Sequence, residues 1–267
     1  MLVPGLVSVT FRDLDAEEII DLAREAGLRA VEWGGDVHVP PGDTGRARDI
    51  GDRCRAAGLE IGGYGSYHKA GVTDPAGFPD IVATAAALGA PRVRVWAGTT
   101  GSAETGPEQR ARTVEDIRRC AGVAAQAGLR VTVEHHVESL TDDLVSALRL
   151  HAEAASPALV PHWQPRESPD AEACLREVTA LLPRLESVHA FSWGDDGYTE
   201  RLPLADRADL WRPVLGLLAA DGARREVLLE FVQDDSPEAL LRDAADLRGW
   251  IAGTVGADAA APAVPGV

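Results

Sequence analysis

The sequence is almost free of lysine. Among its 267 residues Lys69 is the only lysine, and arginine supplies the rest of the positive charge. Lys69 is therefore the single candidate for a catalytic Schiff base, because that chemistry requires a lysine amine. Basic residues are few in total, and the formal net charge is −16. Such an acidic surface repels a phosphate backbone, so we expect no nucleic-acid partner.

Cysteine and long apolar runs are scarce as well. Cys54, Cys120 and Cys174 are odd in number and widely spaced, which argues against a disulfide framework and favours packed, reduced thiols. No apolar run approaches the roughly 18 residues that a membrane span needs. The first residues, MLVPGLVSV, carry no basic segment of the kind that begins a secretory signal. These features predict a cytoplasmic protein that has no membrane partner.

Glycine-rich phosphate loops are also missing, since no GxGxxG or GxxxxGK[ST] pattern lies between a strand and a helix. Glycine recurs instead where predicted helices end, and an apolar strand follows each time. Four such segments read EAG-LRAVEW, AAG-LEIGGY, ALG-APRVRVW and QAG-LRVTVE. Glycine is favoured just after a helix because it adopts positive φ without a Cβ clash. The pattern therefore predicts a repeated strand–helix unit.

Eight strands are predicted along the chain, and helices fill the intervals. The strands are Leu6–Thr10, Ala30–Trp33, Glu60–Tyr64, Val93–Trp96, Val131–His135, Ala158–Gln164, Ser187–Trp193 and Val227–Val232. This alternation indicates an α/β protein with a single (β/α)8 barrel over residues 1–252. An open, doubly wound sheet is the alternative, and the missing glycine loop disfavours it. The last helix is expected from about Pro237 to Ile251, and residues 253–267, rich in Ala, Gly, Val and Pro, are expected to form a disordered tail.

The active site of such a barrel lies at the carboxyl ends of its strands. Side chains alternate along a strand, and the valines beside Glu134 suit the helix-facing side, so Glu134 points inward. The same reasoning turns Gln164, His189 and Glu230 inward at the ends of the last three strands. Neighbouring strands lie about 4.8 Å apart, so these four side chains can converge.

Two carboxylates, one amide oxygen and one imidazole suit a divalent cation. Oxygen-rich ligation with one nitrogen favours Mn²⁺, with Mg²⁺, Co²⁺ or Zn²⁺ as alternatives. A different interpretation is that an inward carboxylate pairs with Arg92 or Arg94 on the fourth strand. Glu32 on the second strand is the expected partner of that arginine.

These residues resemble the sugar phosphate isomerase/epimerase superfamily, the xylose isomerase-like TIM barrels. The resemblance covers roughly residues 3–252 and rests on VEWGGDVHVPPGD, YGSYHKAG, RVWAG, VEHH, HWQP, VHAFSW and LLEFV. It implies that Glu134, His189 and Glu230 bind a divalent metal and that the two glutamates do acid–base chemistry. The family's metal-binding aspartate falls here on Gln164, which keeps an oxygen donor but removes a negative charge. The two remaining carboxylates would just neutralise a divalent ion.

The resemblance implies a metal-dependent isomerase or epimerase that acts on a keto sugar or related polyol through an enediolate. A dehydratase acting on an inosose-like substrate and a non-catalytic barrel subunit are alternatives. A phosphodiesterase like endonuclease IV is disfavoured, because the early strands offer only His38 and His68 as further histidine ligands. Members of the superfamily are often dimers or tetramers, so a homodimer or homotetramer is a further expectation.

Five residues near the predicted mouth are candidates for substrate contact. Trp96 and Trp193 stand at strand ends, where indoles commonly wall sugar sites, although core packing suits each equally. His136 follows the inward glutamate by two residues. His38 lies in a Pro/Gly-rich loop that could cover the mouth, or it is an ordinary loop histidine. Arg201 could reach a phosphate or hydroxyl group, or it could be solvated.

Overall fold

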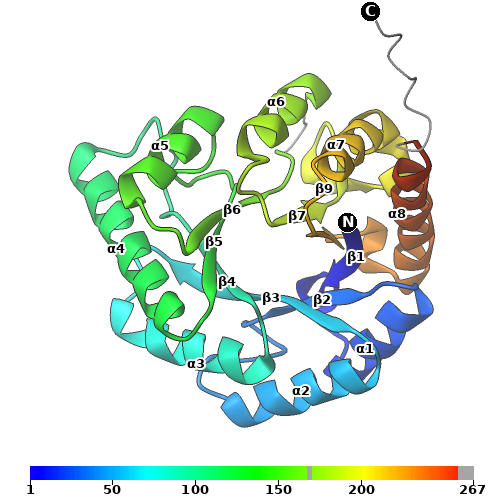
Figure 1. Cartoon of the computed structure of the whole chain (residues 1–267), viewed down its shortest axis with the longest axis horizontal. Coiled ribbons are helices and arrows are strands. Elements are labelled where there is room, and N and C mark those ends of the chain that lie inside the picture. Colours follow the sequence, from blue (N-terminus) through cyan, green and yellow to red (C-terminus); the bar gives the residue numbers. More distant parts are fainter. Residues whose placement is uncertain (167–169, 258–267) are drawn as a thin grey trace, which may run out of the picture.

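Eight parallel strands close into a barrel that a ring of helices surrounds (Figure 1). The computed structural model describes residues 1–166 and 170–257 of the chain. Around the barrel the strands follow the order β1-β10-β7-β6-β5-β4-β3-β2, and each pairs in parallel with its neighbours. The predicted (β/α)8 barrel is therefore confirmed.

The barrel strands are short, and a helix follows each of them before the next begins. The strands are β1 (Leu2–Val7), β2 (Ala30–Gly34), β3 (Glu60–Lys69), β4 (Arg92–Trp96), β5 (Arg130–Glu134), β6 (Leu159–Trp163), β7 (Ser187–Ala190) and β10 (Arg225–Leu229). The helices are α1 (Ala16–Glu25), α2 (Thr44–Ala56), α3 (Phe78–Leu88), α4 (Pro107–Gln126), α5 (Leu144–Ala154), α6 (Ala171–Leu181), α7 (Ala208–Ala220) and α8 (Pro237–Ala257). Short 3-10 helices are η1 (Ser8–Phe11), η2 (Pro75–Gly77), η3 (Leu204–Arg207) and η4 (Gln233–Asp235). An antiparallel hairpin of β8 (Ser192–Gly194) and β9 (Gly197–Leu202) follows β7.

The four glycines that predicted the repeat adopt the expected conformation. Gly27, Gly58, Gly89 and Gly128 have φ of 66°, 76°, 85° and 73°, and each lies directly after a helix or one residue further on. A left-handed residue ends the helix and turns the chain toward the next strand. The start of α1 is equally local in origin, because Asp15 forms the predicted capping box with Glu18.

Several predicted boundaries differ from the structure. The predicted strand Leu6–Thr10 lies too late, because β1 starts at the second residue of the chain and η1 follows it. The predicted strand Ser187–Trp193 divides into β7 and the first strand of the hairpin. The predicted strand Val227–Val232 ends early, so Glu230 follows β10 instead of lying within it. β3 runs five residues beyond its predicted end at Tyr64, as far as Lys69.

The last helix is longer than the sequence indicated. α8 continues to Ala257, so residues 253–257 are helical where a disordered tail was expected. Glycine lowers helix propensity without forbidding a helix, and the first proline of this segment is Pro262. The rest of the predicted tail, 258–267, lies outside the described residues.

The main apolar core lies between the strands and the helices, and Trp33, Trp163 and Trp211 are fully buried there. A second, smaller apolar cluster consists of Val3, Val7, Val9, Ala30 and Leu228. Cys54, Cys120 and Cys174 are buried free thiols, as predicted.

Glycines on β3 leave space beside the polar side chains of the barrel interior. A Cβ at Gly65 would lie 2.7 Å from Nη2 of Arg94, and one at Gly63 would lie 3.0 Å from Oε2 of Glu32. Close approach of this kind is a recognised reason for glycine within a strand. The wall formed by β3 therefore gives room to long side chains from its neighbours.

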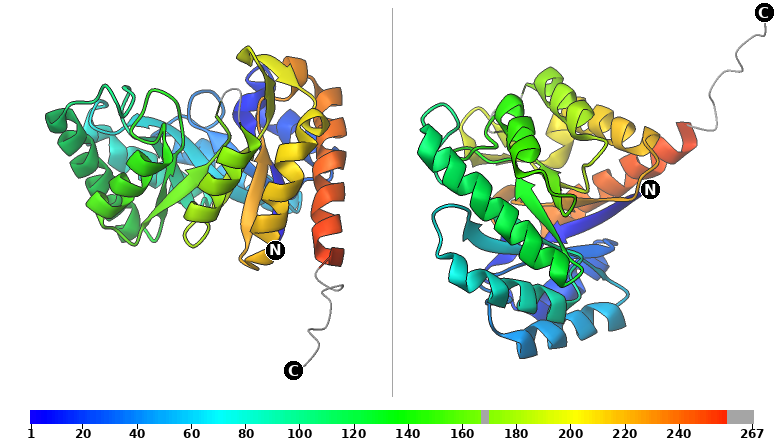
Figure 2. Two further views of the ribbon diagram at one scale, coloured as in Figure 1. Left: turned by 90° about the horizontal axis from the view of Figure 1, so that it is seen from above. Right: turned by 60° about the vertical axis from the view of Figure 1, so that its left-hand side comes forward.

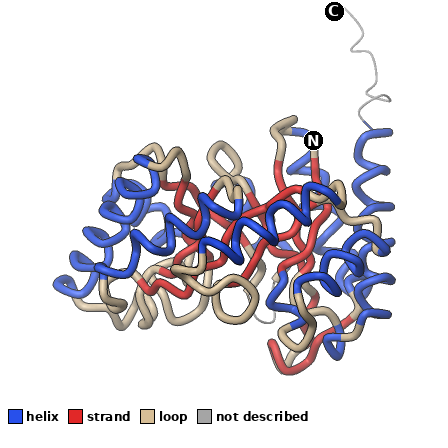
Figure 3. Tube along the Cα trace, turned by 90° about the horizontal axis from the view of Figure 1, so that it is seen from below, coloured by secondary structure: helices blue, strands red, loops and turns tan. Residues whose placement is uncertain are grey.

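We call the end where the barrel strands finish the mouth, and the opposite end the base. Figure 2 shows the yellow β8–β9 hairpin at one end of the barrel and the N-terminus at the other. At the base, the terminal amine donates to the carbonyl oxygens of Gly222 (3.2 Å) and Ala223 (2.7 Å). The helices lie outside the strands along the whole barrel (Figure 3). Within the described part of the chain, no helix is both long and apolar enough to span a membrane.

Candidate active site

The four residues predicted to face inward are all buried at the mouth side of the barrel. The exposed fractions are 3% for Glu134, 8% for Gln164, 0% for His189 and 4% for Glu230. Glu134 is the last residue of β5, His189 lies on β7, and Gln164 and Glu230 directly follow β6 and β10. They therefore come from four strands that are consecutive around the barrel.

The guanidinium of Arg94 joins two carboxylates within this group. Arg94 lies on β4 and is 4% exposed. Its Nε donates to Oε1 of Glu32 at 2.8 Å, and its Nη1 donates to Oε2 of Glu134. Burial would lower the pKa of Arg94, but the two carboxylates raise it above its ordinary value. Glu32 is thus the expected partner of this arginine, and Glu134 shares it.

Glu134 is held in its ionised form. Nε1 of Trp96 donates to the same oxygen that accepts from Arg94. Burial would raise the pKa of Glu134, but the charges of Arg94 and His189 outweigh it and lower the pKa. An ionised carboxylate is the form that accepts a proton, and the lowered pKa makes Glu134 a weaker base than a free glutamate.

His189 lies between two carboxylates. Its Nδ1 is 3.1 Å from Oε2 of Glu230, and its Nε2 is 3.4 Å from Oε1 of Glu32. Neither contact has the alignment of a hydrogen bond, so both ring nitrogens are without a hydrogen-bond partner in the described structure. Burial would lower the pKa of His189, but Glu230 and Glu32 raise it to about 9. At neutral pH this environment favours the imidazolium form of His189.

A second imidazole approaches from β6. His162 is fully buried, and its ring centroid lies 4.0 Å from that of His189. Its Nδ1 is 2.6 Å from Oγ of Ser187, while its Nε2 has no hydrogen-bond partner among the described residues. Burial and the charge of His189 hold the pKa of His162 well below its ordinary value, so this imidazole is neutral. Oε1 of Gln164, on the same inward face, also has no partner in the described structure.

The charges and donors of this cluster fit a divalent cation. Glu32, Glu134 and Glu230 carry one negative charge more than Arg94 and a protonated His189 balance. A divalent ion that displaced the proton of His189 would make the cluster neutral. The unpartnered nitrogens and amide oxygen are the donor types that such an ion uses.

Within residues 1–166 and 170–257, two groups of side chains have donor atoms close enough together to hold a metal ion. Donor atoms of Glu32, His162 and His189 lie within 4.8 Å of one another, and so do those of His68, Asp116 and Cys120. The second group lies between β3 and α4, where Arg119 and the amide of Gly71 already occupy both oxygens of Asp116. Glu134 and Glu230 do not belong to either group.

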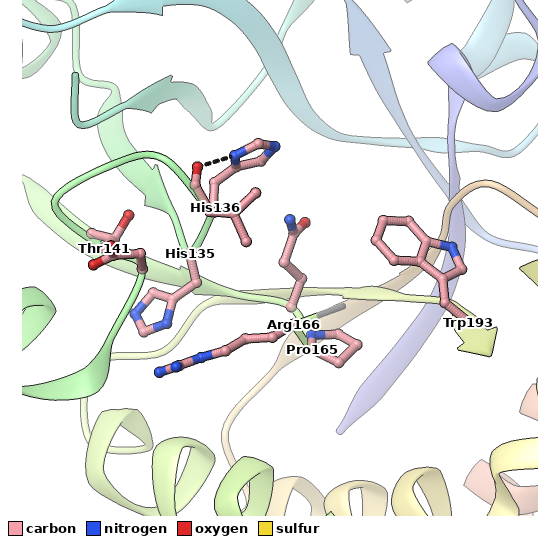
Figure 4. Close-up of a pocket in the computed structure, with 9 residues that line it drawn as sticks. His135, His136, Thr141, Pro165, Arg166 and Trp193 are labelled. Atoms are coloured by element: carbon pink, nitrogen blue, oxygen red, sulfur yellow. Dashed lines mark hydrogen bonds between the residues drawn. The ribbon is translucent and has the colours of Figure 1, made fainter. Parts of the chain in front are cut away.

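A cavity at the mouth lies beside this cluster (Figure 4). Its volume is about 40 Å³, which is room for a few water molecules, and Gln164 contributes to its wall. The side chains of His136 and Trp193 lie on either side of it, and Arg166 extends toward His135. Nε1 of Trp193 has no partner in the described structure, and the ring of His136 lies 5.3 Å from that of Trp96. Three of the predicted substrate residues are thus near one another: Trp96, His136 and Trp193.

The model of the xylose isomerase-like TIM barrel family matches residues 20–247. The chain belongs to this family. A comparison with curated proteins gives no match.

Solved structures share the fold at low sequence identity. The probable 3-DHS dehydratase AsbF from Bacillus anthracis aligns with a TM-score of 0.76 and 19% identity, over 93% of this chain and 99% of its own. An L-ribulose 3-epimerase aligns with a TM-score of 0.75 and 15% identity, over 99% of this chain and 100% of its own. A xylose isomerase-like TIM barrel protein from Mycobacterium smegmatis, in complex with magnesium, aligns with a TM-score of 0.70 and 14% identity, over 95% of this chain and 97% of its own.

The two other predicted substrate residues of this xylose isomerase-like barrel make contacts elsewhere. His38 is 1% exposed, and its ring nitrogens lie 3.1 Å from Oγ of Ser8 and 3.1 Å from the carbonyl oxygen of Leu14. Arg201, on β9, forms an ion pair with Asp235 and lies 4.9 Å from the ring centroid of Phe231. The contacts of both side chains are therefore with residues outside the acidic cluster.

Three residues of the cluster were not assigned a site role by the sequence: Glu32, Arg94 and His162. The signal for His162 was present in the alternation of β6, which places it on the face of Gln164. The sequence did not reveal the register between β5 and β6, in which His162 is paired with Glu134. Register across a barrel depends on strand stagger, which local alternation does not report.

Proposed function

We propose that the chain is an isomerase or epimerase that moves a proton on a keto sugar or related polyol through an enediolate. One observation carries the proposal: two carboxylates, Glu134 and Glu230, are buried at the mouth of the barrel, and Glu230 lies beside the buried imidazole of His189. An enediolate forms when a base removes the proton next to a carbonyl group, and it returns to a ketone or aldehyde when an acid delivers a proton.

Glu134 is the proposed base. In the first step the C–H bond next to the carbonyl breaks, the proton passes to Glu134, and the electron pair becomes the double bond of the enediolate. Arg94 and Trp96 fix the orientation of this carboxylate through its Oε2, which leaves Oε1 to face the substrate. A base fixed in this way needs no rearrangement at the moment of transfer.

Glu230, after it takes up a proton from solvent, is the proposed partner that delivers a proton to the carbon or to the oxygen next to it. Glu134 then releases to solvent the proton that it removed, which restores both carboxylates. Its carboxylate lies beside Nδ1 of His189. Proton return to the same carbon from the other face gives an epimer, whereas return to the neighbouring carbon moves the carbonyl group. His136 and Trp193, which line the cavity, and Trp96, which packs against His136, are the proposed walls of the substrate site. His38 and Arg201 remain predicted contacts.

His189 and the carboxylates around it are the proposed holders of a divalent ion. When bound, such an ion polarises the carbonyl group and stabilises the negative charge of the enediolate. Glu134, Gln164, His189 and Glu230 are the ligands that the sequence predicts, with manganese favoured for that oxygen-rich set. A homo-oligomer remains a prediction.

Deuterium exchange tests the proposed function. The purified chain would be incubated in D2O with a panel of ketoses, their phosphates and inososes, with and without added Mn²⁺, Mg²⁺, Co²⁺ or Zn²⁺. We expect deuterium to enter one substrate at the carbon next to its carbonyl group, as measured by NMR and mass spectrometry. Absence of exchange on every substrate, with each metal present, would contradict the proposal and favour a barrel without catalysis.

A dehydratase is the second candidate, because a structure of the same fold is described as a probable 3-DHS dehydratase. The first step would be the same. The enediolate would then lose its β-hydroxyl group, which takes up a proton and leaves as water, in place of accepting that proton at carbon. A mass loss of one water in the same assay separates this outcome from isomerisation.

A further inference from the structure

The unpartnered nitrogen of His162 is the starting point. His162 lies on β6 opposite Glu134 and is 0% exposed. Its Nδ1 lies 2.6 Å from Oγ of Ser187, within hydrogen-bond distance. Its Nε2 has no hydrogen-bond partner in the part of the chain that the structure describes. A buried polar atom without a partner is costly, so its environment calls for a ligand or an ordered water.

The spacing of the surrounding donors suits a metal ion. Nε2 of His189 and Oε1 of Glu32 lie 3.4 Å apart, and a donor atom of His162 lies within 4.8 Å of both residues' donors. Two ligands of a tetrahedral ion with bonds of about 2.05 Å are separated by about 3.4 Å. Small side-chain shifts can therefore bring the three atoms around one ion.

Each of the two histidines already has a neighbour at its other ring nitrogen. Ser187 contacts the other nitrogen of His162, and Glu230 lies 3.1 Å from the other nitrogen of His189. Nε of Arg94 donates at 2.8 Å to Oε1 of Glu32, the same oxygen that lies 3.4 Å from Nε2 of His189, so the guanidinium and the ion would share this oxygen. Metal-bound histidines almost always have such a partner at the second nitrogen, because it fixes the ring orientation and the tautomer.

We propose that the divalent ion of this site is bound by Glu32, His162 and His189, with His162 in the role that the sequence assigned to Gln164. The inference rests on the metal dependence in the proposed function and changes the ligand set. Gln164 then faces the cavity, where its amide is available to the substrate. Glu134 and Glu230 are released from ligation and act on protons and on the orientation of His189.

This ligand set has a consequence for metal choice. Two imidazoles and one carboxylate favour borderline ions such as Zn²⁺, Co²⁺ and Fe²⁺, whereas carboxylate and carbonyl oxygens favour Mn²⁺ and Mg²⁺. Three protein ligands are also the number found in catalytic zinc sites. We therefore expect selectivity for Co²⁺ and Zn²⁺ over Mn²⁺, in contrast to the expectation from the sequence.

Equilibrium dialysis with metal analysis tests the ligand set on the full chain after removal of metal with EDTA. We expect one Zn²⁺ or Co²⁺ per chain, bound at least tenfold more tightly than Mn²⁺. His162→Ala should weaken Co²⁺ binding at least 100-fold, and His162→Asp should restore binding with a preference for Mn²⁺. The matched control is Gln164→Ala, which should change the affinity less than threefold.

Unchanged Co²⁺ affinity in His162→Ala, or its loss in Gln164→Ala, would overturn the ligand set. Proton NMR of the Co²⁺ form of the unmodified chain keeps the test valid if a variant fails to fold. Two strongly shifted, exchangeable imidazole N–H signals are expected, and one signal alone contradicts the inference. If the two signals appear but no substrate exchanges deuterium, the proposed function fails while the ligand set stands. If the EDTA-treated chain binds none of the metals but still exchanges deuterium into a substrate, the ligand set fails while the proposed function stands.

Discussion

Two arginines on β4, only two residues apart, show how the base and the mouth of the barrel differ. Arg92 and Arg94 are both 4% exposed, and both form ion pairs with glutamates inside the barrel. At the base, Arg92 pairs with Glu226 and lies 3.7 Å from Glu186. At the mouth, Arg94 pairs with Glu32 and Glu134.

The difference lies in how the carboxylates are balanced. At the base, Glu226 and Glu186 each have a further arginine, Arg224 and Arg130. At the mouth, the third carboxylate, Glu230, pairs among the described residues with the imidazole of His189 alone. The base is thus neutralised by permanent charges, whereas the mouth depends on a group that can lose its proton. A balanced network serves stability, and an unbalanced one is the place to expect chemistry.

The sharpest way to break this comparison is to neutralise a glutamate at each end. Glu134→Gln and Glu230→Gln should each reduce turnover on the order of 10³-fold, because they remove a proton-transfer group. Glu226→Gln is the matched variant at the base, and its turnover should stay within about threefold of that of the unmodified chain. The measurement is kcat on the substrate found by deuterium exchange, with circular dichroism to verify folding. Comparable losses at both ends would show that the ends do not differ in role.

The second test concerns stability. Arg92→Met should lower the free energy of unfolding by about 3 kcal/mol, because Glu226 remains buried and loses its partner inside the barrel. Urea denaturation followed by circular dichroism measures this loss. The double variant with Glu226→Gln should recover part of it, since the uncompensated charge is then gone. A single variant as stable as the original would mean that water or Arg224 already screens Glu226.

The third test separates the acid response of the mouth from that of a histidine outside the barrel. Burial and the charge of Arg184 lower the pKa of His151, on α5, to about 4. Its folded-state pKa is below the unfolded value, so its contribution to stability is complete above pH 6.5 and falls as the pH drops toward 4. We expect a loss of about 2 kcal/mol between pH 7 and pH 5 from this residue.

The measurement is urea denaturation of the original chain and of His151→Leu at both pH values. Neither ring nitrogen of His151 has a hydrogen-bond partner in the described structure, so the leucine variant breaks no hydrogen bond. Its pH slope should be flatter. Equal slopes in the two proteins would show that groups other than His151 cause the acid response.

The smallest expected effect comes from the rim of the base. Glu60 contacts Arg224 and lies 3.4 Å from Arg29, and its side chain is 47% exposed. Solvent screens such pairs, so Glu60→Gln should change the free energy of unfolding by less than about 1 kcal/mol. The same denaturation experiment in low and high salt checks this. A larger loss of unfolding free energy would show that the ion pairs of Glu60 contribute to stability as the buried pairs of the base do.

The sequence was sufficient for the architecture because its signals are local. The glycines at 27, 58, 89 and 128 each mark a helix end through one backbone conformation. Alternation along β5 likewise placed Glu134 inward without any knowledge of other strands. The hairpin after β7 was missed, because an apolar run such as AFSW reads as a continuous strand whether or not its backbone changes partners.

The contacts of the site were only partly predictable, because they depend on distances between strands. That Arg94 has a glutamate partner was foreseen, but that it joins two of them depends on the length of its side chain and on β2, β4 and β5 together. His162 was overlooked for the same reason, since its pairing with Glu134 is a matter of register.

The absence of a side chain at Gly65, on β3, leaves the space that the guanidinium of Arg94, on β4, occupies. A methyl group there would meet the guanidinium of Arg94, which two carboxylates hold in place. Relatives in which alanine or a larger residue replaces Gly65 should therefore carry a shorter residue at position 94, and their pair of glutamates should change with it. Covariation among these four positions would mark the members of the family that have kept this arrangement of charges.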